Sequence, residues 1–520
     1  MKNTFKIPDK LSISDLVKIA LNPEANIDFD EKVFKRVAKG RQTLEKLVKD
    51  GRTIYGVNTG MGGFVSWLIP KDKLRELQEN LLKGVATNVG DFFSDEIVRA
   101  TMLARIHSLA RGHSAVSEEN FRKLIAIFNA GIVPCIPEKG SLGASGDLGP
   151  LACIALVGIG QWKAKFNGKI MPALDALKEA KIEPMKLDFK EGLAMINGTS
   201  AMVGLASILI NEVESLLKIY DVISAITLET LKATRKPFDP KVHALKPHKG
   251  QLITAENIFT ILADSKMISD EDMVSSVLQK NRENNPKKSP IPIEDAYSLR
   301  CTPQIIGPIR DNLGVISKVV EDELNSSNDN PLVIESEQNV FHNGNFHGQY
   351  IAMAMDHLAI SLTTLSNLSD RRIDRFLDSH HSNGLPPFLS PKPGLQFGLM
   401  GGQFMATSLA AENRSLCIPL SVQTLTSTED FQDIVSMGLI AARRARTILE
   451  NTKYIIAFEL MCACQAADIR GKEQLSSRTK ILYEMVREIV PYYEKDNFMT
   501  DHLEALAKKI PFQFLENLNL

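Results

Sequence analysis

The residues best suited to unusual chemistry lie in the glycine-dense run 140–150, Gly-Ser-Leu-Gly-Ala-Ser-Gly-Asp-Leu-Gly-Pro. No amino-acid side chain is a good electrophile, so a protein that needs one must bind a cofactor or build the group from its own backbone. The tripeptide Ala144-Ser145-Gly146 permits the second route. The amide nitrogen of Gly146 can attack the carbonyl carbon of Ala144, and loss of water from the ring and from Ser145 leaves an exocyclic methylidene. Because a Cβ at position 146 would hinder this attack, glycine is required there.

Other interpretations of these glycines fit less well. Gly140, Gly143 and Gly146 are spaced by three, which matches neither the phosphate-binding loop nor the dinucleotide-binding pattern. A nucleophile elbow needs a glycine two residues after its serine, where this chain has Asp147. An ordinary loop remains the alternative, since Ala-Ser-Gly is a common tripeptide. Functional groups elsewhere in the chain decide between the two.

Those groups occur in short segments spread along the chain. They are Tyr55 in the glycine-rich stretch 55–63, Asn197 in 196–200, Tyr297 and Arg300 in 297–300, Asn330 before Pro331, Phe346 in 345–347, and Gln432 before Asp433. In this order the segments resemble the signature motifs of the aromatic amino acid ammonia-lyases and 2,3-aminomutases. The resemblance runs from about residue 55 to residue 470. Within this family, the chain resembles bacterial phenylalanine aminomutases and lyases most strongly.

The resemblance implies a cofactor and a set of residue roles. The cofactor is 4-methylidene-imidazol-5-one (MIO), formed autocatalytically from Ala144-Ser145-Gly146, with no metal and no diffusible cofactor. It would serve as the electrophile toward the amine of the substrate. Tyr55 would remove the β-proton, and Arg300 would bind the substrate carboxylate through its planar guanidinium. A phenol has an ordinary pKa near 10, so we expect nearby donors to lower the pKa of Tyr55.

The remaining motif residues receive supporting roles from the same resemblance. Asn330 would assist at the carboxylate, Tyr297 and Asn197 would face the MIO ring, and Phe346 would pack beside the ring or the substrate's aryl group. Gln432 would join the polar network around the bound amine.

Two residues bear on the choice of substrate. Gly84 and Val85 stand where similar histidine lyases carry Ser-His and tyrosine lyases carry His-Leu. Neither residue offers a side-chain hydrogen bond to an imidazole or a phenol, and a buried hydroxyl left unpaired costs about 1–3 kcal/mol. Gln432 also replaces the glutamate of histidine lyases. We therefore expect phenylalanine as substrate.

Asp147 has two interpretations. It could help to activate the backbone during cyclisation, or it could cap the helix that begins directly after it.

The second half of the chain is patterned as long helices. Stretches 201–235 and 438–470 contain almost no proline and carry apolar faces throughout. A coiled-coil-like seam with alternating gaps of four and three is formed by Ile351, Met355, Leu358, Leu362 and Leu365, and a similar one by Ile309, Leu313, Ile316 and Val320. We expect a mainly α fold, a long-helix bundle like those of aspartase and histidine ammonia-lyase.

Strand signals are few. The runs at Ile54-Tyr55 and at 163–170 predict at most small β hairpins, and the polar stretch 280–290 predicts an exposed loop. We expect an MIO-bearing N-terminal domain at 1–200, followed by the central helix bundle and C-terminal helical region at 201–520.

The overall composition limits the partners and the compartment. The net charge is −1 over 520 residues, which argues against a nucleic-acid partner or an anionic membrane surface. The N-terminus lacks an apolar signal core, so we expect a cytoplasmic protein. Cys462 and Cys464 lie in an apolar run and indicate buried free thiols, and His342 and His347 lack zinc-site spacing, so we expect no metal. The family resemblance implies a homotetramer whose active sites are shared among subunits.

The leading hypothesis is conversion of L-phenylalanine to β-phenylalanine, to trans-cinnamate and ammonia, or to both. A barrier difference of about 1.4 kcal/mol changes that partition tenfold, so the motifs do not decide between mutase and lyase. A tyrosine or histidine ammonia-lyase is the alternative, and a noncatalytic helical scaffold is a more distant one.

Overall fold

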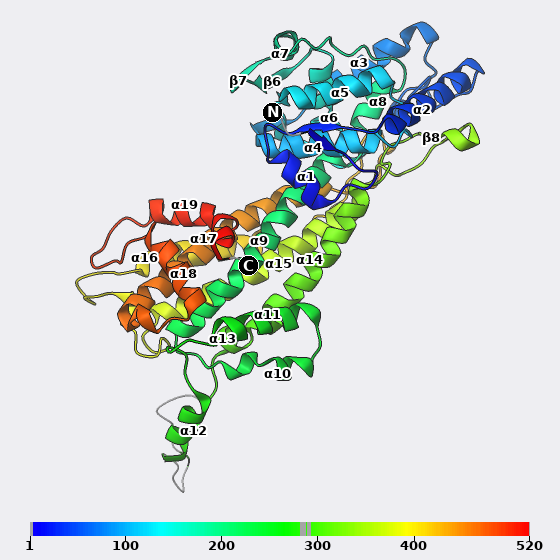
Figure 1. Cartoon of the computed structure of the whole chain (residues 1–520). Coiled ribbons are helices and arrows are strands. Elements are labelled where there is room, and N and C mark those ends of the chain that lie inside the picture. The colour runs from blue at the N-terminus through cyan, green and yellow to red at the C-terminus, as the bar shows by residue number, and fades with distance from the viewer. Residues whose placement is uncertain (1–3, 281–285, 287, 289–292, 519–520) are drawn as a thin grey trace. The chain divides into compact units, whose positions relative to one another are not determined.

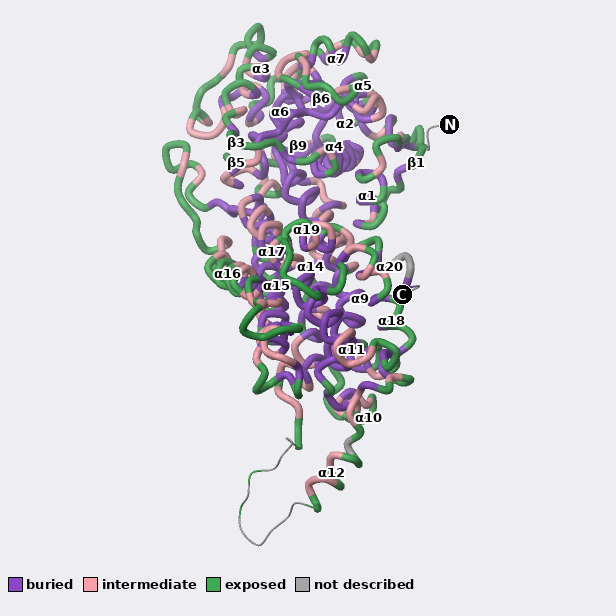
Figure 2. Tube along the Cα trace, turned by 90° about the vertical axis from the view of Figure 1, so that its left-hand side faces the viewer, coloured by how far each residue is buried: buried purple, intermediate pink, exposed green. Residues whose placement is uncertain are grey.

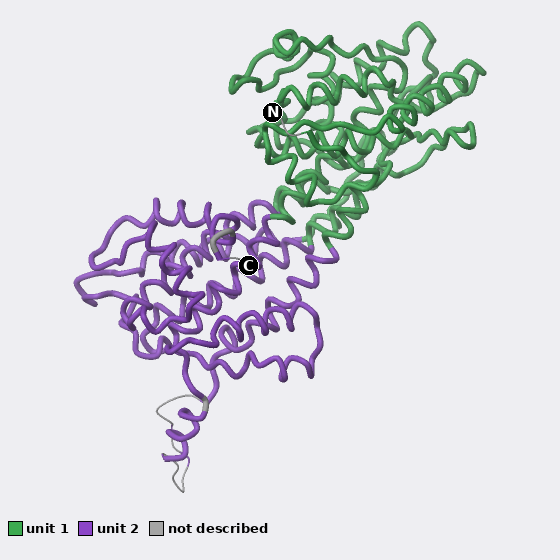
Figure 3. Tube along the Cα trace, in the orientation of Figure 1, with its two compact units in different colours: residues 1–211, 316–356, 419–444 green, residues 212–315, 357–418, 445–520 purple. Residues whose placement is uncertain are grey.

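The computed structural model describes residues 4–280, 286, 288 and 293–518, so most of the expected loop at 280–290 lies outside the described residues. The chain forms two compact units (Figure 3). Unit 1 consists of residues 1–211, 316–356 and 419–444, and unit 2 of residues 212–315, 357–418 and 445–520. The division into domains at residue 200 stays a prediction.

Unit 1 contains eight complete helices among its described residues (Figure 1). They are α1 Ile13–Ala20, α2 Glu31–Lys49, α3 Leu74–Val85, α4 Asp95–Leu109, α5 Glu118–Ala130, α6 Leu148–Gly158, α7 Ala173–Glu179 and α8 Glu191–Ile196. Helices α3, α6 and α8 pack against one another. Helix α6 is apolar on all sides and fully buried except for its first residue, as a core helix should be.

The strands of the described chain all belong to unit 1 and are short. They are β1 Thr4–Lys6, β2 Asn26–Asp28, β3 Val89–Phe92, β4 Val133–Pro134, β5 Pro137–Lys139, β6 Lys163–Phe166, β7 Lys169–Pro172, β8 Leu332–Ile334 and β9 Asn339–Phe341. They form one parallel pair, β1–β2, and the antiparallel sheets β3–β5, β4–β6–β7 and β8–β9.

One of the two expected hairpins forms. Strands β6 and β7 join through Asn167 and Gly168, both with positive φ, which suits the twist of a two-residue hairpin. The run at Ile54-Tyr55 is a turn instead of a strand. The amide of Ile54 donates to the side chain of Asn58 at 2.7 Å, so a side chain supplies the partner that a neighbouring strand would have given.

The long helices that the apolar patterns predict are present, and four of them contribute residues to both units. They are α9 Ser200–Thr230, α14 Thr302–Leu324, α15 Gln349–Leu377 and α17 Gly438–Arg470. The seam residues Ile351, Met355, Leu358, Leu362 and Leu365 have no exposed surface. Figure 2 colours the chain by burial and shows buried stretches among the long helices. Helix α9 is long and apolar enough to cross a membrane, but 72% of its apolar window is buried inside the protein, which is typical of a core helix.

The other described helices belong to unit 2. They are α10 Pro240–Ala244, α11 Lys249–Ile261, α12 Glu271–Lys280, α13 Tyr297–Arg300, α16 Met400–Leu416, α18 Ser477–Arg487, α19 Thr500–Lys509 and α20 Gln513–Leu518. Cys462 and Cys464 are free and fully buried in α17, as their apolar run indicates.

A buried apolar cluster in unit 1 anchors the loop that carries Tyr55. It joins the C-terminal half of α2, the loop itself and the β8–β9 hairpin, through Leu44, Leu47, Ile54, Val57, Ala115, Val333 and Val340. Ile54 and Val57 have no exposed surface, so both ends of this short turn are fixed in the core.

Candidate functional site

The tripeptide 144–146 forms a tight turn. Gly143 and Gly146 have φ of +72° and +71°, and the backbone of Gly146 pairs with Gly143, with Ala144 and with Gly198. A Cβ on Gly146 would lie 2.0 Å from the carbonyl oxygen of Gly198. The turn therefore brings the backbones of residues 144 and 146 together at a position that only glycine can occupy.

The turn lies at the start of two buried helices. Helix α6 begins at Leu148, and α9 begins at Ser200, two residues after Gly198. The amide of Asp147 donates to Gly198 O at 2.7 Å, and the amide of Gly198 donates to Ser145 O at 3.2 Å. Because helix N-termini carry partial positive charge, this is a favourable place for negative charge to develop.

The hydrogen bonds of Asp147 bear on its expected role as a helix cap. Its carboxylate accepts from the amide of Met202 in the first turn of α9 at 2.8 Å and from Ser141 Oγ at 3.1 Å, and it makes no capping bond to α6. It thus binds the start of α9 and does not cap its own helix. Complete burial raises the pKa of Asp147 to about 7.

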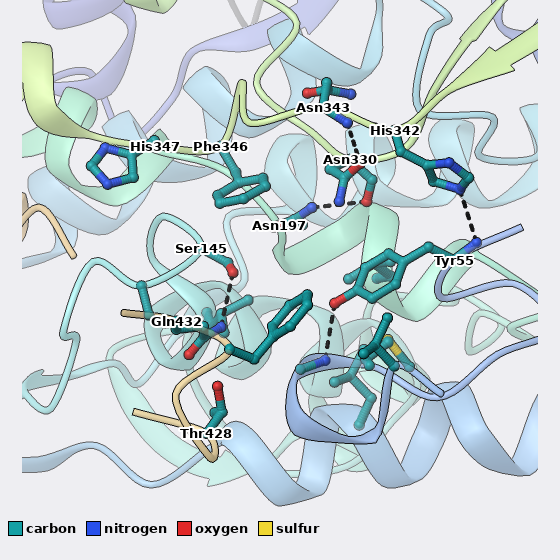
Figure 4. Close-up of a pocket in the computed structure, with 18 of the residues that line it drawn as sticks. Tyr55, Ser145, Asn197, Asn330, His342, Asn343, Phe346, His347, Thr428 and Gln432 are labelled. Carbon is teal, nitrogen blue, oxygen red and sulfur yellow. Dashed lines mark hydrogen bonds between the residues drawn. The ribbon is translucent and has the colours of Figure 1, made fainter. Parts of the chain in front are cut away.

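A cavity of about 740 Å³ opens beside this turn in unit 1 (Figure 4). The expected site residues that line it are Tyr55, Val85, Ala144, Ser145, Asn197, Asn330, Phe346 and Gln432. Apolar side chains, including Leu81, Leu148, Leu193 and Phe431, form much of the remaining wall. A cavity of this size and lining suits a small, largely apolar ligand.

Tyr55 is held by hydrogen bonds at its side-chain hydroxyl and at its backbone amide. Its hydroxyl oxygen accepts from the amide of Gly62 at 3.0 Å, and its own amide donates to His342 Nε2 at 3.1 Å (Figure 4). Its ring stacks on Phe431 with 6.4 Å between centroids. The pKa of Tyr55 is raised, because loss of solvent outweighs the lowering by the Gly62 amide. The downward shift expected from neighbouring donors is therefore absent in this arrangement.

The side chain of Asn197 is fixed by buried charge. Its Nδ2 donates to Asp329 Oδ1 at 2.9 Å and to Asn330 O at 3.0 Å. Asp329 in turn pairs with Lys190 at 2.7 Å, and neither side chain has exposed surface. Because both amide hydrogens of Asn197 are occupied, its carbonyl oxygen is the atom left to face a ligand.

Gln432 connects the cavity wall to the reactive serine. Its Nε2 donates to Ser145 Oγ at 3.2 Å (Figure 4). Its Oε1 accepts from Ser427 Oγ at 3.0 Å. The chain between these residues turns through Thr428, Glu429 and Asp430, all with φ between 51° and 61°. Three successive non-glycine residues in this conformation are strained, as is common near functional sites.

Four expected residues do not line the cavity. Gly84 is exposed on α3, and a Cβ there would meet nothing within 4 Å. Tyr297 and Arg300 belong to unit 2; Tyr297 is 70% exposed, and Arg300 pairs with Glu294 at 2.8 Å. Gly146 lies in the turn beneath Ser145. The roles of all these residues remain predictions.

His342 and Asn343 also line the cavity, although the sequence motifs did not predict them there. His342 accepts from the amide of Tyr55, and the amide of Asn343 donates to Asn330 Oδ1 at 2.8 Å. Both precede the Asn345-Phe346 motif by a few residues, and this proximity is the sequence signal that could have identified them as cavity residues. In the part of the chain that the structure describes, no group of three His, Cys, Asp or Glu residues could hold a metal ion.

Comparisons with known proteins extend over nearly the whole chain. A family model described as aromatic amino acid lyase matches residues 11–488. The chain is 45% identical over 483 residues to a tyrosine ammonia-lyase of Cupriavidus metallidurans, covering 92% of this chain and 90% of that protein. It is 41% identical over 498 residues to an MIO-dependent tyrosine 2,3-aminomutase of Streptomyces globisporus, covering 95% and 92%.

Among solved structures, the Pantoea agglomerans phenylalanine aminomutase matches with a TM-score of 0.95 and 53% identity, covering 98% of this chain and 99% of that one. This agreement confirms the expected mainly α, long-helix fold.

Proposed function

The chain belongs to the aromatic amino acid lyase family and is an enzyme of the ammonia-lyase and aminomutase type, and from this premise we propose that it acts on L-phenylalanine. The products are β-phenylalanine, trans-cinnamate with ammonia, or both. The observation that carries the proposal is the Ser145 turn at the wall of a largely apolar cavity, with the neutral Gln432 hydrogen-bonded to Ser145.

The turn fits an MIO group made from residues 144–146. The backbone of Gly146 already pairs with Ala144, Gly146 has no room for a Cβ, and the Ser145 hydroxyl faces the cavity. When formed, this group supplies an electrophile toward the α-amino group of the substrate.

The chain's own residues bind the substrate and move the proton. As the phenolate, Tyr55 accepts the β-proton of the substrate and becomes the neutral phenol, and the Gly62 amide hydrogen bond stabilises the phenolate before this transfer. Asn330 contacts the carboxylate, Phe346 packs against the aryl ring, and Gln432 orients the amine. Arg300 and Tyr297 reach the site from a neighbouring subunit of a cytoplasmic homotetramer, where Arg300 binds the carboxylate.

Phenylalanine is favoured because the cavity offers its aryl end little to hydrogen-bond. Leu81, Val85 and Leu193 are apolar, and the Nε2 of His342 is already occupied by the Tyr55 amide. A tyrosine hydroxyl buried against these residues would lose its water without gaining a partner.

A tyrosine substrate is the second candidate, because two relatives at 45% and 41% identity are named for tyrosine. Assays with L-phenylalanine, L-tyrosine and L-histidine, read by ultraviolet absorbance and chiral chromatography without added cofactor, distinguish these substrates. We expect the highest kcat/KM with L-phenylalanine, and a preference for either other amino acid would contradict the assignment.

The cofactor is tested by intact mass. Two lost waters make the purified chain about 36 Da lighter than its encoded mass, whereas Ser145→Ala removes the dehydration of the serine and abolishes turnover. Full turnover by the variant would overturn the proposed cofactor, and an unshifted wild-type mass without turnover would support the noncatalytic scaffold.

A further inference from the structure

A second cavity in unit 1 carries a concentration of positive charge. It has a volume of about 400 Å³, shares no lining residue with the cavity beside Ser145, and is formed by α2, the turn 111–113 and the segment from β8 to Ser336. Its cationic lining residues are Lys32, Lys35, Arg36, Lys39 and Arg111. His113 also lines it, but burial and the charges of Arg111 and Arg36 lower the pKa of this imidazole.

The walls of this cavity are fixed by backbone contacts. A Cβ on Gly40 of α2 would lie 2.0 Å from the carbonyl oxygen of Gly112, so the helix and the turn touch directly. The amide of Val333 in β8 donates to His113 O at 2.8 Å. The basic groups are therefore carried on a preformed frame, which lowers the entropy that a ligand must remove on binding.

The spacing along α2 gathers its charges on one side. Lys32, Lys35, Arg36 and Lys39 follow one another at intervals of three, one and three residues. Residues three and four apart on a helix are neighbours, and like charges at these spacings destabilise it. The four cationic side chains on this side of α2 therefore repel one another beside the cavity.

The protein neutralises this charge incompletely. Among the lining residues, which the structure describes in full, Glu335 has the one carboxylate, 3.7 Å from Lys39. Outside the lining, Asp9 pairs with Lys32 at 2.8 Å and with Arg36 at 3.3 Å. Within the described residues Lys35 and Arg111 have no carboxylate partner.

Arg111 is a partly buried cationic residue of the lining. Its Nε is buried without a hydrogen-bond partner in the described chain, and its Nη2 reaches Asn325 Oδ1 at 3.5 Å. Burial and the charge of Arg36 lower the pKa of Arg111. Arg111 also lines the cavity, and guanidinium N–H groups form strong hydrogen bonds to anionic oxygens.

We propose that this cavity binds a small polyphosphate. Several clustered cations match an anion with more than one negative charge, and guanidinium groups pair well with phosphate oxygens. No Phe, Tyr or Trp side chain occurs in the lining, so charge pairing with the phosphates is the main recognition that these residues offer. The ligand is either a free polyphosphate chain or the polyphosphate part of a nucleotide. The site is independent of the proposed reaction.

Isothermal titration of the intact protein with sodium tripolyphosphate, at about 50 mM salt so that screening stays modest, tests the proposal. We expect saturable binding of one ligand per chain. The double variant Lys35→Gln, Arg111→Gln should weaken binding at least tenfold, and Lys35→Gln alone several-fold if the arginine substitution perturbs folding. The matched control Lys49→Gln, Lys178→Gln removes the same charge from exposed positions outside the cavity and should change the affinity less than twofold.

Parallel titrations with ATP and citrate identify the chemistry. ATP binding tighter than tripolyphosphate assigns a nucleotide, and equal affinity assigns the phosphate chain; both support the site. Absence of saturable binding, equal weakening in the control variant, or citrate binding as tight as tripolyphosphate would each overturn the proposal.

Discussion

Glycine at position 146 is required by space as well as by backbone conformation. Its φ of +71° resembles that of Gly168 at +76°, but a Cβ at Gly168 meets nothing within 4 Å, whereas one at Gly146 meets a backbone carbonyl at 2.0 Å. A substitution at Gly168 would therefore cause backbone strain alone, whereas the same substitution at Gly146 would cause both strain and steric overlap.

Gly168→Ala should lower the free energy of unfolding by about 1–2 kcal/mol and leave turnover unchanged. Gly146→Ala should destabilise the chain by about 3 kcal/mol or more and abolish both the mass loss and the turnover, because the turn cannot close around a Cβ. Urea unfolding, intact mass and the cinnamate assay measure these effects. Equal effects of the two substitutions would contradict the steric argument.

The buried carboxyl of Asp147 should leave a mark on the pH dependence of stability. Its pKa rises from 3.8 to about 7 on folding, so the folded state binds its proton more tightly than the unfolded state. The stability that this proton contributes is complete below pH 3.8 and is lost as the pH rises through about 7.

Between these limits the wild type should lose up to about 1.4 kcal/mol of unfolding free energy per pH unit relative to Asp147→Asn, which does not titrate. Urea unfolding of both proteins from pH 4 to pH 8 provides the comparison. Parallel stability curves would show that Asp147 has no raised pKa.

At the scale of elements, the sequence predicted those helices whose apolar residues repeat at regular intervals within one element. The seam from Ile351 to Leu365 repeats within one helix, so α15 could be predicted without knowing its neighbours. The left-handed turn at Thr428, Glu429 and Asp430 could not, because it contains no glycine and is closed by bonds between Ser427 and Gln432.

Local patterns also could not predict that His342 belongs to the site. His342 joins it through the amide of Tyr55, a bond between residues 287 positions apart that no local pattern reveals. Motif resemblance was needed to associate Tyr55 with Ser145 at all, because their sequence spacing carries no periodic signal.

Gln78 is a buried link between two helices and the Tyr55 loop. From α3 its Oε1 accepts from the amide of Leu193 in α8 at 3.0 Å, and its Nε2 donates to Gly56 O at 3.1 Å. Gln78→Met keeps the length of the side chain but leaves both backbone groups unpaired, which should cost about 2–5 kcal/mol. Because Gly56 follows Tyr55, we also expect kcat to fall about tenfold under conditions where the variant is fully folded.

Circular dichroism melting and steady-state kinetics measure the two effects separately. Gln42→Met, an exposed change on α2, is the matched control and should alter neither stability nor kcat. A Gln78→Met variant with wild-type kcat would show that this link supports the fold but does not position Tyr55.

At the scale of the whole molecule, the exposed apolar surface indicates assembly. Phe64, Trp67 and Leu68 are 65%, 66% and 74% exposed beside the glycines of the Tyr55 loop, and Tyr297 is 70% exposed in unit 2. Large apolar side chains gathered in one short segment are typical of surfaces that a partner covers. This agrees with the proposal that Tyr55 and Arg300 act in one site although they come from different chains.

Mixing of inactive subunits tests that proposal directly. Tyr55→Phe removes the proton acceptor and Arg300→Ala removes the carboxylate ligand, so each variant alone should lose at least about a hundredfold in kcat/KM. If the sites are shared, co-expressed subunits form some sites with an intact Tyr55 from one chain and an intact Arg300 from another. Turnover should then recover to a sizeable fraction of the wild-type value.

The control is Tyr55→Phe mixed with Asn330→Ala, two residues that line the same cavity of one chain. No mixed assembly can then contain an intact site, because each chain's own cavity keeps one defect, and turnover should stay low. Recovery in the first mixture alone requires Arg300 to come from another chain. Sites complete within a single chain would leave both mixtures equally inactive, since each chain would still carry its own defect.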